Sequence, residues 1–360
     1  MTTYKERISC ESCGHTEFDV IYDFGEVPLA GSFPKEPDAK INTYPLKIVK
    51  CKHCELVQTN TLIPPKTLFK DYRYISSVGM QNHFNNFADW LVRTQKITPN
   101  SKVLEFGCND GPLLDALKHR GIHNTIGVDP ATNIVELGRR KSLDIIDDFF
   151  NYNFAKNKEW EDKFDLILAS NTFAHIEDIN SVIKGVHYSL KPKGRFIFEV
   201  QYLVDLVDKF QFDFMYHEHL FYYTVTSLIP LLSKYNLKII DVESVPIHCG
   251  SIRVVATKDT LESKKERVDG YLEIEKDYQD LSKFSTEISF ALNDLGAQLG
   301  YIKERDKTVA GYGASGRANV VTSTKNWDTN DLMYIVDESP ERYDRFTSNG
   351  KIPIFNPEIL

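Results

Sequence analysis

The chain contains 360 residues, which is enough for two or three domains of roughly 100–200 residues each. Hydrophobic residues make up 42% and charged residues 26%, an ordinary globular composition that excludes collagen-like, disordered and disulfide-scaffold proteins. A net charge of −8 removes a general attraction to nucleic acids and anionic membranes, although a local basic site remains compatible with it. The sequence shows neither a run of roughly 18 apolar residues nor a signal-peptide core, so we expect a soluble cytoplasmic protein without a membrane span.

Prolines interrupt the first 70 residues, and only short strand-like runs stand between them. The segments 45–51 and 55–60 have strand character. This part of the chain has too little periodic apolar sequence for a core of its own. We therefore predict a small module at residues 1–70 that needs a separate source of stability.

Cysteine spacing points to that source. Two CxxC pairs lie in the module, formed by Cys10 with Cys13 and by Cys51 with Cys54. Two such pairs can place four thiolates around one tetrahedral zinc ion, whose binding contributes folding energy. Two local disulfides or unrelated thiols are the alternatives, and a reducing compartment favours zinc. Because sulfur would fill all four positions, the predicted role of this zinc is structural.

From about residue 80 the chain alternates between predicted helices and strands. The strands are at 102–108, 124–130, 164–170 and 195–200, with helices at 81–95, 112–121, 134–142 and 179–194. This alternation predicts an α/β fold with a parallel sheet covered on both faces. One more helix and two more strands follow within 227–257. The ligand of such a sheet binds at the carboxyl ends of its strands.

The first predicted strand runs into a glycine-containing turn and then a helix. Gly107 and Gly111 allow a ligand close to the backbone, and the helix offers free N–H groups. The second strand ends at Asp129, where a carboxylate can bind both ribose hydroxyls of an adenosine. Taken alone, such a glycine turn is more often a purely structural βα turn.

The segment 214–224 concentrates histidines, a carboxylate and phenols after the fifth strand, and we expect it to begin a helix beside the ligand pocket. An imidazole can remove a proton near neutral pH, a phenol can stabilise an oxyanion, and a carboxylate can orient the imidazole. A half-buried polar surface and a metal site are the alternatives. The zinc-peptidase motif is excluded because His217 and His219 are two residues apart, on different faces of a helix.

Five segments in order resemble class I S-adenosylmethionine-dependent methyltransferases. They are LEFGCNDG, GVDP, IIDDFFN, FDLILASNTFAHIED and LKPKGRFIFE. The resemblance implies a Rossmann-like core that binds S-adenosylmethionine. It also implies a set of cofactor-binding residues, with Glu105, Gly107 and Asn109 at the methionine end, Asp129 at the ribose, Asp148 and Phe149 at the adenine, and Gly111 and Asn171 completing the pocket.

A narrower resemblance covers essentially the whole chain. The twin CxxC pairs, DYRYISS at 71–77, AHI at 174–176, YHEH at 216–219, HCGSIRV at 248–254 and GYGA at 311–314 are similar, in this order, to sugar C-methyltransferases that act on nucleotide-linked keto-deoxysugars. Two departures from the family pattern are small, namely Cys249 in place of a glycine and Thr224 in place of a serine.

This resemblance implies roles for the acceptor site. His219 would be the general base and Tyr216 would help to hold the enolate, with Glu218 and His175 completing the catalytic set. The implied substrate-binding residues are Tyr74, Tyr222, His248, Arg253 and Gly313. The chemistry agrees, because methylation of carbon requires a carbanion and a ketone makes one accessible after a base removes the α proton. A sugar O- or N-methyltransferase of the same fold and a non-catalytic sugar-nucleotide binding protein are the alternatives.

The last part of the chain, 256–360, predicts long charged helices followed by a second strand–glycine–helix unit. Gly311, Gly313 and Gly316 form a GxGxxG pattern, and Asp337 closes the next strand. Alone this pattern indicates a dinucleotide site, which makes an NAD-dependent oxidoreductase the rival hypothesis. The family resemblance instead implies a degenerate nucleotide fold that completes the acceptor site, with a helix N-terminus to hold the sugar's diphosphate. Only two strands are evident, so we expect a truncated or short module after the methyltransferase domain at 71–255.

Overall fold

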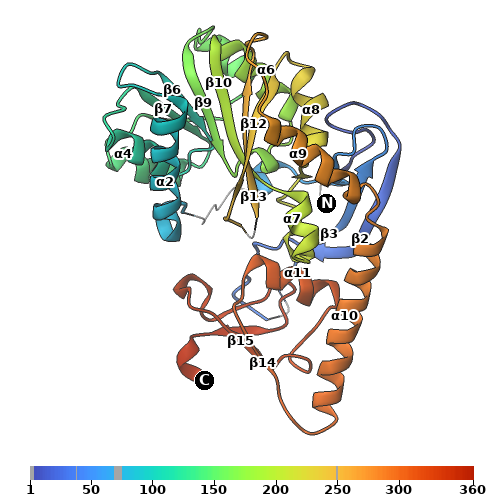
Figure 1. Ribbon diagram of the computed structural model, residues 1–360. Helices are drawn as coiled ribbons and strands as arrows, with labels where there is room; N and C mark the ends of the chain where they lie inside the picture. Colours follow the sequence, from blue (N-terminus) through green and yellow to red (C-terminus); the bar gives the residue numbers. More distant parts are fainter. Residues whose placement is uncertain (1–3, 38, 69–74, 249) are drawn as a thin grey trace.

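A seven-stranded sheet forms the centre of the molecule, which is described here from a computed structural model over residues 4–37, 39–68, 75–248 and 250–360. Figure 1 shows the N-terminal module beside this sheet and the C-terminal module below, with the long helix α10 (Ser282–Lys303) running along one side. None of the helices in the described ranges has the length and apolar content that crossing a membrane requires.

The central sheet has the strand order β12-β13-β10-β9-β6-β7-β8. Strands β8, β7, β6, β9 and β10 are parallel, whereas β13 is antiparallel to both β10 and β12. The chain winds outward in one direction from β6 and in the other from β9, so the carboxyl ends of these two strands form the switch point where ligands bind. The bounds are β6 Val103–Phe106, β7 Thr125–Asp129, β8 Ile145–Asp147, β9 Phe164–Ser170, β10 Leu190–Gln201, β12 Lys238–Val245 and β13 Ser251–Thr257.

Helices cover both faces of this sheet, which confirms the predicted α/β class. Val103 packs with α2 (Ser77–Gln95) and α3 (Pro112–Lys118) on one face. Leu104, the next residue of β6, packs with the opposite layer. That layer contains α5 (Tyr152–Asn157), α6 (Ile179–Ser189) and α8 (Val225–Ser233), while α4 (Thr132–Arg140) follows β7. Because side chains alternate along a strand, every position of β6 is buried by one layer or the other.

The N-terminal module is built on a four-stranded sheet of order β11-β4-β3-β2. The predicted runs 45–51 and 55–60 contain strand residues, and the module adds a longer strand before them. The bounds are β2 Phe18–Pro28, β3 Thr43–Cys51, β4 Val57–Thr59 and β11 Phe221–Tyr222, with β1 Lys5–Glu6 paired to β5 Thr61–Leu62 and the short helix α1 at Pro65–Leu68. Strand β11 comes from the histidine-rich segment, so this sheet is completed by a distant part of the chain.

The expected helix start at 214–224 was wrong. The structure places a 3₁₀ turn η2 at Phe212–Phe214, then a loop and β11, and α8 begins only at Val225. Thr224 and Ser227 form a reciprocal capping box, in which each side-chain oxygen accepts from the other residue's backbone N–H at 3.1 Å. This cap sets the start of the helix and leaves the histidines in the preceding loop.

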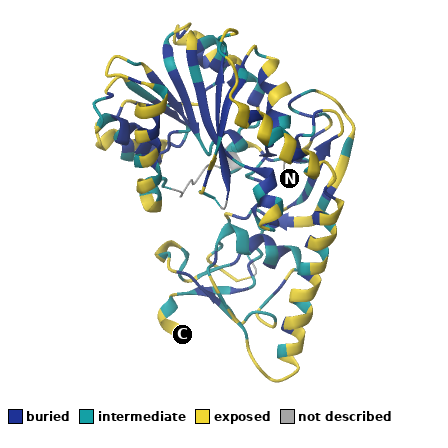
Figure 2. Cartoon of the chain, in the orientation of Figure 1, coloured by how far each residue is buried: buried dark blue, intermediate teal, exposed yellow. Residues whose placement is uncertain are grey.

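The C-terminal module contains a four-stranded sheet of order β14-β15-β17-β16. The expectation of only two strands was therefore wrong. The two additional strands contain two and three residues, too few to show periodicity in the sequence. The bounds are β14 Ala310–Tyr312, β15 Tyr334–Val336, β16 Arg345–Phe346 and β17 Pro353–Phe355, with α11 at Gly316–Thr324. Figure 2 shows that this module has a smaller buried core than the central sheet and that much of α10 is exposed.

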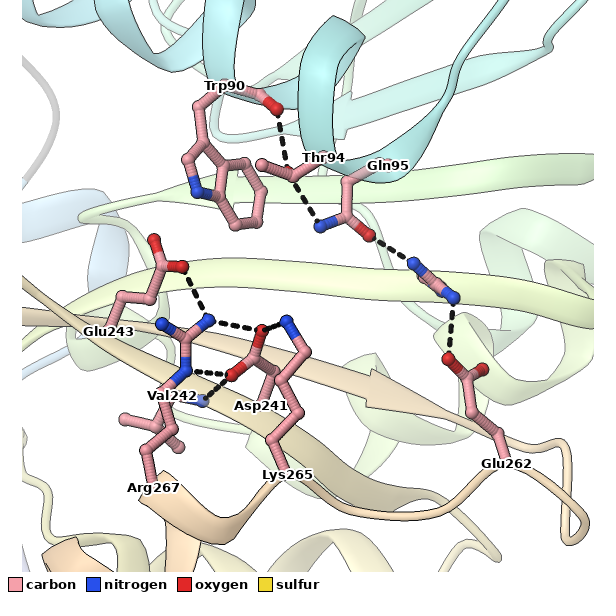
Figure 3. Close-up of polar contacts among 10 residues, drawn as sticks. Trp90, Thr94, Gln95, Asp241, Val242, Glu243, Glu262, Lys265 and Arg267 are labelled. Atoms are coloured by element: carbon pink, nitrogen blue, oxygen red, sulfur yellow. Dashed lines mark hydrogen bonds and ion pairs between the residues drawn. The ribbon is translucent and has the colours of Figure 1, made fainter.

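Ion pairs hold the start of α9, which leads into the C-terminal part of the chain, against the central sheet. Asp241 on β12 is buried and accepts from Lys265 Nζ at 2.6 Å and from the Arg267 guanidinium, which also contacts Glu243. Figure 3 shows this cluster where the chain enters α9 (Glu266–Glu275). Burial alone would raise the pKa of Asp241, but the bonds from Arg267 and Lys265 outweigh it and lower the pKa. The start of α9 is thereby anchored to the central sheet.

Candidate functional site

A cleft of about 1320 Å³ lies at the carboxyl ends of β6, β7 and β9. All three parts of the chain line it. The N-terminal module contributes residues 29–34, and the C-terminal module contributes Gly316, Ser339, Glu341 and Arg342. The N-terminal module also contributes Glu11, Pro65 and Leu68, and the central domain supplies the remaining wall, including all four predicted catalytic residues.

The glycine loop forms one end of the cleft. Gly107 has φ +63°, and a Cβ atom there would lie 2.1 Å from Cγ2 of Thr172. Thr172 Oγ1 donates to the Gly107 carbonyl at 3.0 Å, which holds the two loops together. Asn109 follows, also with positive φ, and lines the cleft. The position therefore requires glycine, because the Thr172 side chain fills the space that a Cβ would take, and Gly107 itself lines the cleft.

Asp129 stands at the end of β7 on the same wall. Its carboxylate oxygens accept from Asn109 N at 2.8 Å and from Ala131 N at 2.9 Å. Burial raises its pKa, and the two backbone bonds oppose that shift. A carboxylate oxygen has two acceptor positions, so Asp129 can also accept from the hydroxyls of a bound ribose.

Of the other predicted cofactor residues, some line the cleft and others lie next to residues that do. Phe149 is half exposed, and both Phe149 and Asn171 line the cleft. Asp148 is exposed and caps its neighbour, accepting from Phe149 N at 2.7 Å, but does not line the cleft. Gly111 is the N-cap of α3, has a positive φ and packs against the Leu143 side chain. It does not line the cleft either.

Glu105 is buried beneath the cleft rather than in its lining. Its Oε2 atom has no hydrogen-bond partner among the described residues. Burial and the nearby charges of Asp129 and Glu199 raise its pKa well above the ordinary value. A cationic amine bound near this carboxyl would remove that penalty. The Glu105 carboxyl, the Gly107 turn on the cleft wall and the Asp129 carboxylate together fit the amine and ribose of S-adenosylmethionine.

His219 is held by hydrogen bonds at both ring nitrogens. Nδ1 lies 2.8 Å from the Phe214 carbonyl oxygen, and Nε2 lies 2.9 Å from the Tyr216 hydroxyl. A carbonyl can only accept, so Nδ1 carries the proton of the neutral ring and Nε2 accepts from Tyr216. Burial, followed by the charges of His175 and His248, lowers the His219 pKa well below its usual value. The ring is therefore neutral at pH 7.

Three more predicted residues surround this imidazole on the cleft wall. The His175 ring lies 4.8 Å from that of His219, and its Nδ1–H donates to the Glu218 carbonyl at 2.7 Å. Glu218 Oε1 accepts from Gly31 N at 3.4 Å, and burial raises the carboxyl pKa. His248 also lines the cleft, and burial lowers its pKa.

Three further predicted substrate residues, all within the described part of the chain, do not line the cleft. Tyr222 is buried in β11, with its hydroxyl 3.5 Å from the Phe214 carbonyl oxygen. Arg253 pairs with buried Glu199 and stacks over Phe87 at 3.9 Å. Gly313 forms a turn with φ +93° away from the wall. Tyr74 lies outside the described residues.

Sequence reasoning missed a buried polar network behind the cleft. Glu199, on β10, accepts from His83 Nε2 and Ser170 Oγ, each at 2.8 Å, as well as from Arg253. Burial would raise its pKa, but the bond from His83 and the Arg253 charge lower it overall. An acid inside the apolar strand RFIFEV is a signal that could have identified Glu199. By contrast, nothing in the sequence singles out residues 29–34 or Arg342.

The four cysteine sulfurs of the N-terminal module lie within 4.8 Å of one another. The Sγ atoms of Cys10 and Cys54, and those of Cys13 and Cys51, are 3.5 Å apart. A tetrahedral zinc ion with Zn–S bonds of about 2.3 Å separates its sulfur ligands by about 3.8 Å. The donor set and its spacing therefore fit zinc, and no protein ligand beyond the four sulfurs is needed.

The second glycine motif is arranged differently from a dinucleotide site. The carboxylate of Asp337, which a dinucleotide would use for its ribose, accepts from Ala314 N at 2.7 Å and Ser339 N at 2.8 Å. It also pairs with Arg342 at 2.8 Å. Oδ2 of Asp337 already accepts from two donors, Ala314 N and Arg342, which fills its acceptor positions and weakens the NAD hypothesis.

Comparison with known proteins gives a match for each part of the chain. Three family models match, described as "Putative zinc binding domain" at residues 10–69, "Methyltransferase domain" at 80–242 and "C-methyltransferase C-terminal domain" at 246–360. C-methyltransferase NovU from Streptomyces niveus is 30% identical over 361 residues, covering 97% of this chain and 86% of that protein. Demethylmenaquinone methyltransferase from Staphylococcus saprophyticus is 28% identical over 122 residues, covering 32% of this chain and 52% of that protein.

Solved structures resemble about half of the chain. The PH0226 protein from Pyrococcus horikoshii has a TM-score of 0.42 at 20% identity, covering 54% of this chain and 97% of that one. Magnesium protoporphyrin IX methyltransferase from Synechocystis has a TM-score of 0.41 at 16% identity, covering 51% and 84%. Because the NovU match extends over nearly the whole chain and each part has its own family match, the protein belongs to the S-adenosylmethionine-dependent C-methyltransferases that carry an N-terminal zinc-binding domain and a C-methyltransferase C-terminal domain.

Proposed function

We propose that this protein methylates a ring carbon beside the ketone of a nucleotide-linked keto-deoxysugar. The observation that carries the proposal is the His219–Tyr216 pair, which shares one cleft with Gly107 and Asp129. A base and an oxyanion donor at that place are what carbon methylation needs in addition to the methyl donor.

The methyl donor would occupy the glycine-loop end of the cleft. Gly107 and Asn109 would lie against the methionine portion with Glu105 beneath it. Asp129 would bind the ribose, and the adenine would lie against Phe149, whose backbone N–H donates to Asp148. Asn171 is on the same wall, and Gly111 shapes the loop. When bound, S-adenosylmethionine supplies a methyl group activated by its sulfonium charge.

His219 would act as the general base. Its Nε2 takes the α proton of the sugar, while the C–H electron pair moves toward the ketone and generates an enolate. The Tyr216 hydroxyl, which lies 2.9 Å from Nε2, turns to donate to the enolate oxygen. The enolate carbon would then form the new C–C bond with the methyl group while the S–CH₃ bond breaks, and the electron pair of that bond would stay on sulfur, so that S-adenosylhomocysteine leaves. The Phe214 carbonyl, already bonded to Nδ1–H, stabilises the imidazolium until Nε2 returns its proton to solvent.

The acceptor's diphosphate would bind near the C-terminal module. Arg342, which also pairs with Asp337, provides a cation on the cleft wall, and Gly316, at the N-terminus of α11, belongs to the same lining. His175, Glu218 and His248 surround the sugar in this arrangement, whereas Tyr74 and Gly313 remain predicted contacts. Tyr222 and Arg253 would act indirectly, by supporting the loop and the strand behind the wall.

We also propose that Cys10, Cys13, Cys51 and Cys54 hold one structural zinc ion. The ion would stabilise the module that supplies residues 29–34 to the cleft.

A solvent-exchange assay tests the proposed reaction. The enzyme would be incubated in D₂O with dTDP-, GDP- and CDP-linked keto-deoxysugars without the methyl donor. Exchange of a hydrogen next to the ketone, lost in His219→Ala, is the expected result. In a separate reaction with S-adenosylmethionine in H₂O, NMR of the product should show the new methyl group bonded to the α carbon, which loses one hydrogen, whereas O- or N-methylation would leave the hydrogens of that carbon unchanged. Calorimetry that detected NAD binding but no S-adenosylmethionine binding would refute the proposal.

A further inference from the structure

A guanidinium group from the C-terminal module reaches the loop that carries His219. Arg317 is the second residue of α11. Its Nε and Nη2 atoms donate to the two carboxylate oxygens of Asp213 at 2.9 and 3.0 Å. Its Cζ also lies 4.2 Å from the centre of the Phe214 ring. A forked ion pair combined with a stacked contact is a geometry that arginine provides and lysine does not.

Phe214 contacts His219 through both its backbone and its side chain. Its carbonyl oxygen accepts from His219 Nδ1 at 2.8 Å. The two rings are nearly parallel, with an interplanar angle of 10° and centroids 6.0 Å apart. The position of that carbonyl decides which imidazole nitrogen carries the proton and where the Nε2 lone pair points. Arg317 thus contacts the ring of Phe214, the residue whose carbonyl orients His219.

The same helix also secures the other side of the loop. Asn319 Nδ2 donates to the Ala30 carbonyl at 2.7 Å. The next residue, Gly31, donates its N–H to Glu218 Oε1 at 3.4 Å. Arg317 itself does not line the cleft, although Gly316 does. Its contacts are therefore with the protein groups that hold the loop.

We propose that Arg317 is a positioning residue for His219. By holding Asp213 and Phe214 it keeps the imidazole in the tautomer that presents Nε2 as an acceptor. Docking of the C-terminal module then assembles the base as well as the acceptor site. The inference rests on the proposed role of His219 and adds a residue for which the sequence analysis had no role.

Arg317→Met tests the inference, because methionine retains an apolar stem but cannot make the fork. We expect kcat for methyl transfer and the rate of α-deuterium exchange to fall together by about 10–100-fold. KM for both substrates should change by less than about twofold, since Arg317 does not line the cleft. Arg317→Lys should recover only part of the rate. Arg195→Met is the matched control, because the ion pair of Arg195 with Glu262 lies outside the cleft. The side chains of Arg195 and Glu262 are 30% and 29% exposed, close to the 35% and 23% of Arg317 and Asp213.

A second readout separates positioning from general loss of structure. In ¹⁵N NMR of the ligand-free enzyme, His219 should be the Nδ1–H tautomer in the wild type and a mixture in Arg317→Met. Asp213→Asn should have the same effect, and the double variant should be no worse than either single one. If Arg317→Met lowers the melting temperature but leaves kcat and the tautomer as in Arg195→Met, the inference is wrong while the proposed function stands. Retained turnover in His219→Ala would instead overturn the proposed function.

Discussion

Two histidines that stand two residues apart have different environments in this protein. His219 faces the cleft, with both nitrogens engaged by the loop that holds it. His217 is buried, and its Nε2–H donates to the Pro45 carbonyl at 3.1 Å, so it ties the loop to the N-terminal module. Burial lowers the pKa of His217 to about 4. The sequence identified both imidazoles as candidates but could not tell the base from the structural residue, because the hydrogen-bond partner of His217, Pro45, comes from a distant part of the chain.

The pH dependence of turnover follows from His219. The base is active when neutral, and its pKa is lowered by burial and by His175. We expect kcat/KM to stay constant as pH falls from 8 through 6.5 and to decline only at lower pH. Replacing His175 with Asn removes one of the two neighbouring charges, so the acidic limb should move to higher pH. If the acidic limb of the wild-type kcat/KM profile were centred at or above pH 6.5, His219 would not be the base.

Buried neutral histidines also make stability depend on pH. The unfolded chain binds a proton at His217 near pH 6.5, whereas the folded chain binds it only at about pH 4. The free energy of unfolding should therefore fall as pH drops from 6.5 toward 4, with His217 contributing about 3 kcal/mol. Urea unfolding at several pH values would measure this slope. His217→Asn, which keeps a donor but does not titrate, should flatten it.

Gly107 gives a sharp test of the cofactor loop. Alanine there would combine an unfavourable positive φ with a contact 2.1 Å from Thr172, so binding of S-adenosylmethionine should fall more than about tenfold. Gly121→Ala is the matched control, because Gly121 has φ +77° but no atom within 4 Å of the added Cβ. Calorimetry should show near-normal affinity in that control, and equal losses in both variants would show that strain alone is responsible.

At the scale of elements, long apolar runs were predictable and short strands were not. The buried run FDLILAS became β9, because a strand covered on both faces is apolar throughout. Strand β11 has two residues, and its pairing with Val57 and Gln58 arises only in the folded chain. The same local ambiguity explains why 214–224 was predicted to begin a helix.

The anchor of α9 provides a prediction at this scale. Asp241→Asn leaves Lys265 and Arg267 without their buried carboxylate, so the free energy of unfolding should decrease by about 1–3 kcal/mol at pH 7. Because the pKa of Asp241 is lowered, this contribution is present above its unfolded pKa and disappears as pH falls through the folded value. Denaturant unfolding measures the loss. Glu273→Gln, in an exposed ion pair with Lys276, is the control and should have little effect.

At the scale of the whole molecule, the cleft depends on all three parts of the chain. The N-terminal wall at 29–34 is carried by the module that contains the four cysteines. Cys51→Ser should lower the zinc content measured by mass spectrometry of the metal and decrease the melting temperature. Cys108→Ser should leave the zinc content unchanged, because Cys108 lies outside the sulfur cluster. Full zinc occupancy in Cys51→Ser would rule out the four-thiolate site.

The completion of the N-terminal sheet by β11 has a consequence for biosynthesis. Protein synthesis proceeds at roughly 5–20 residues per second. Phe221 and Tyr222 therefore leave the ribosome about 10–30 s after β4, the strand with which they pair. During that interval the nascent module has an open strand edge, the kind of surface that recruits other chains. Metal uptake by the first cysteines synthesised would hold the unfinished sheet until its last strand arrives. Zinc supply would then influence the yield of folded protein during translation, before any effect on the finished enzyme.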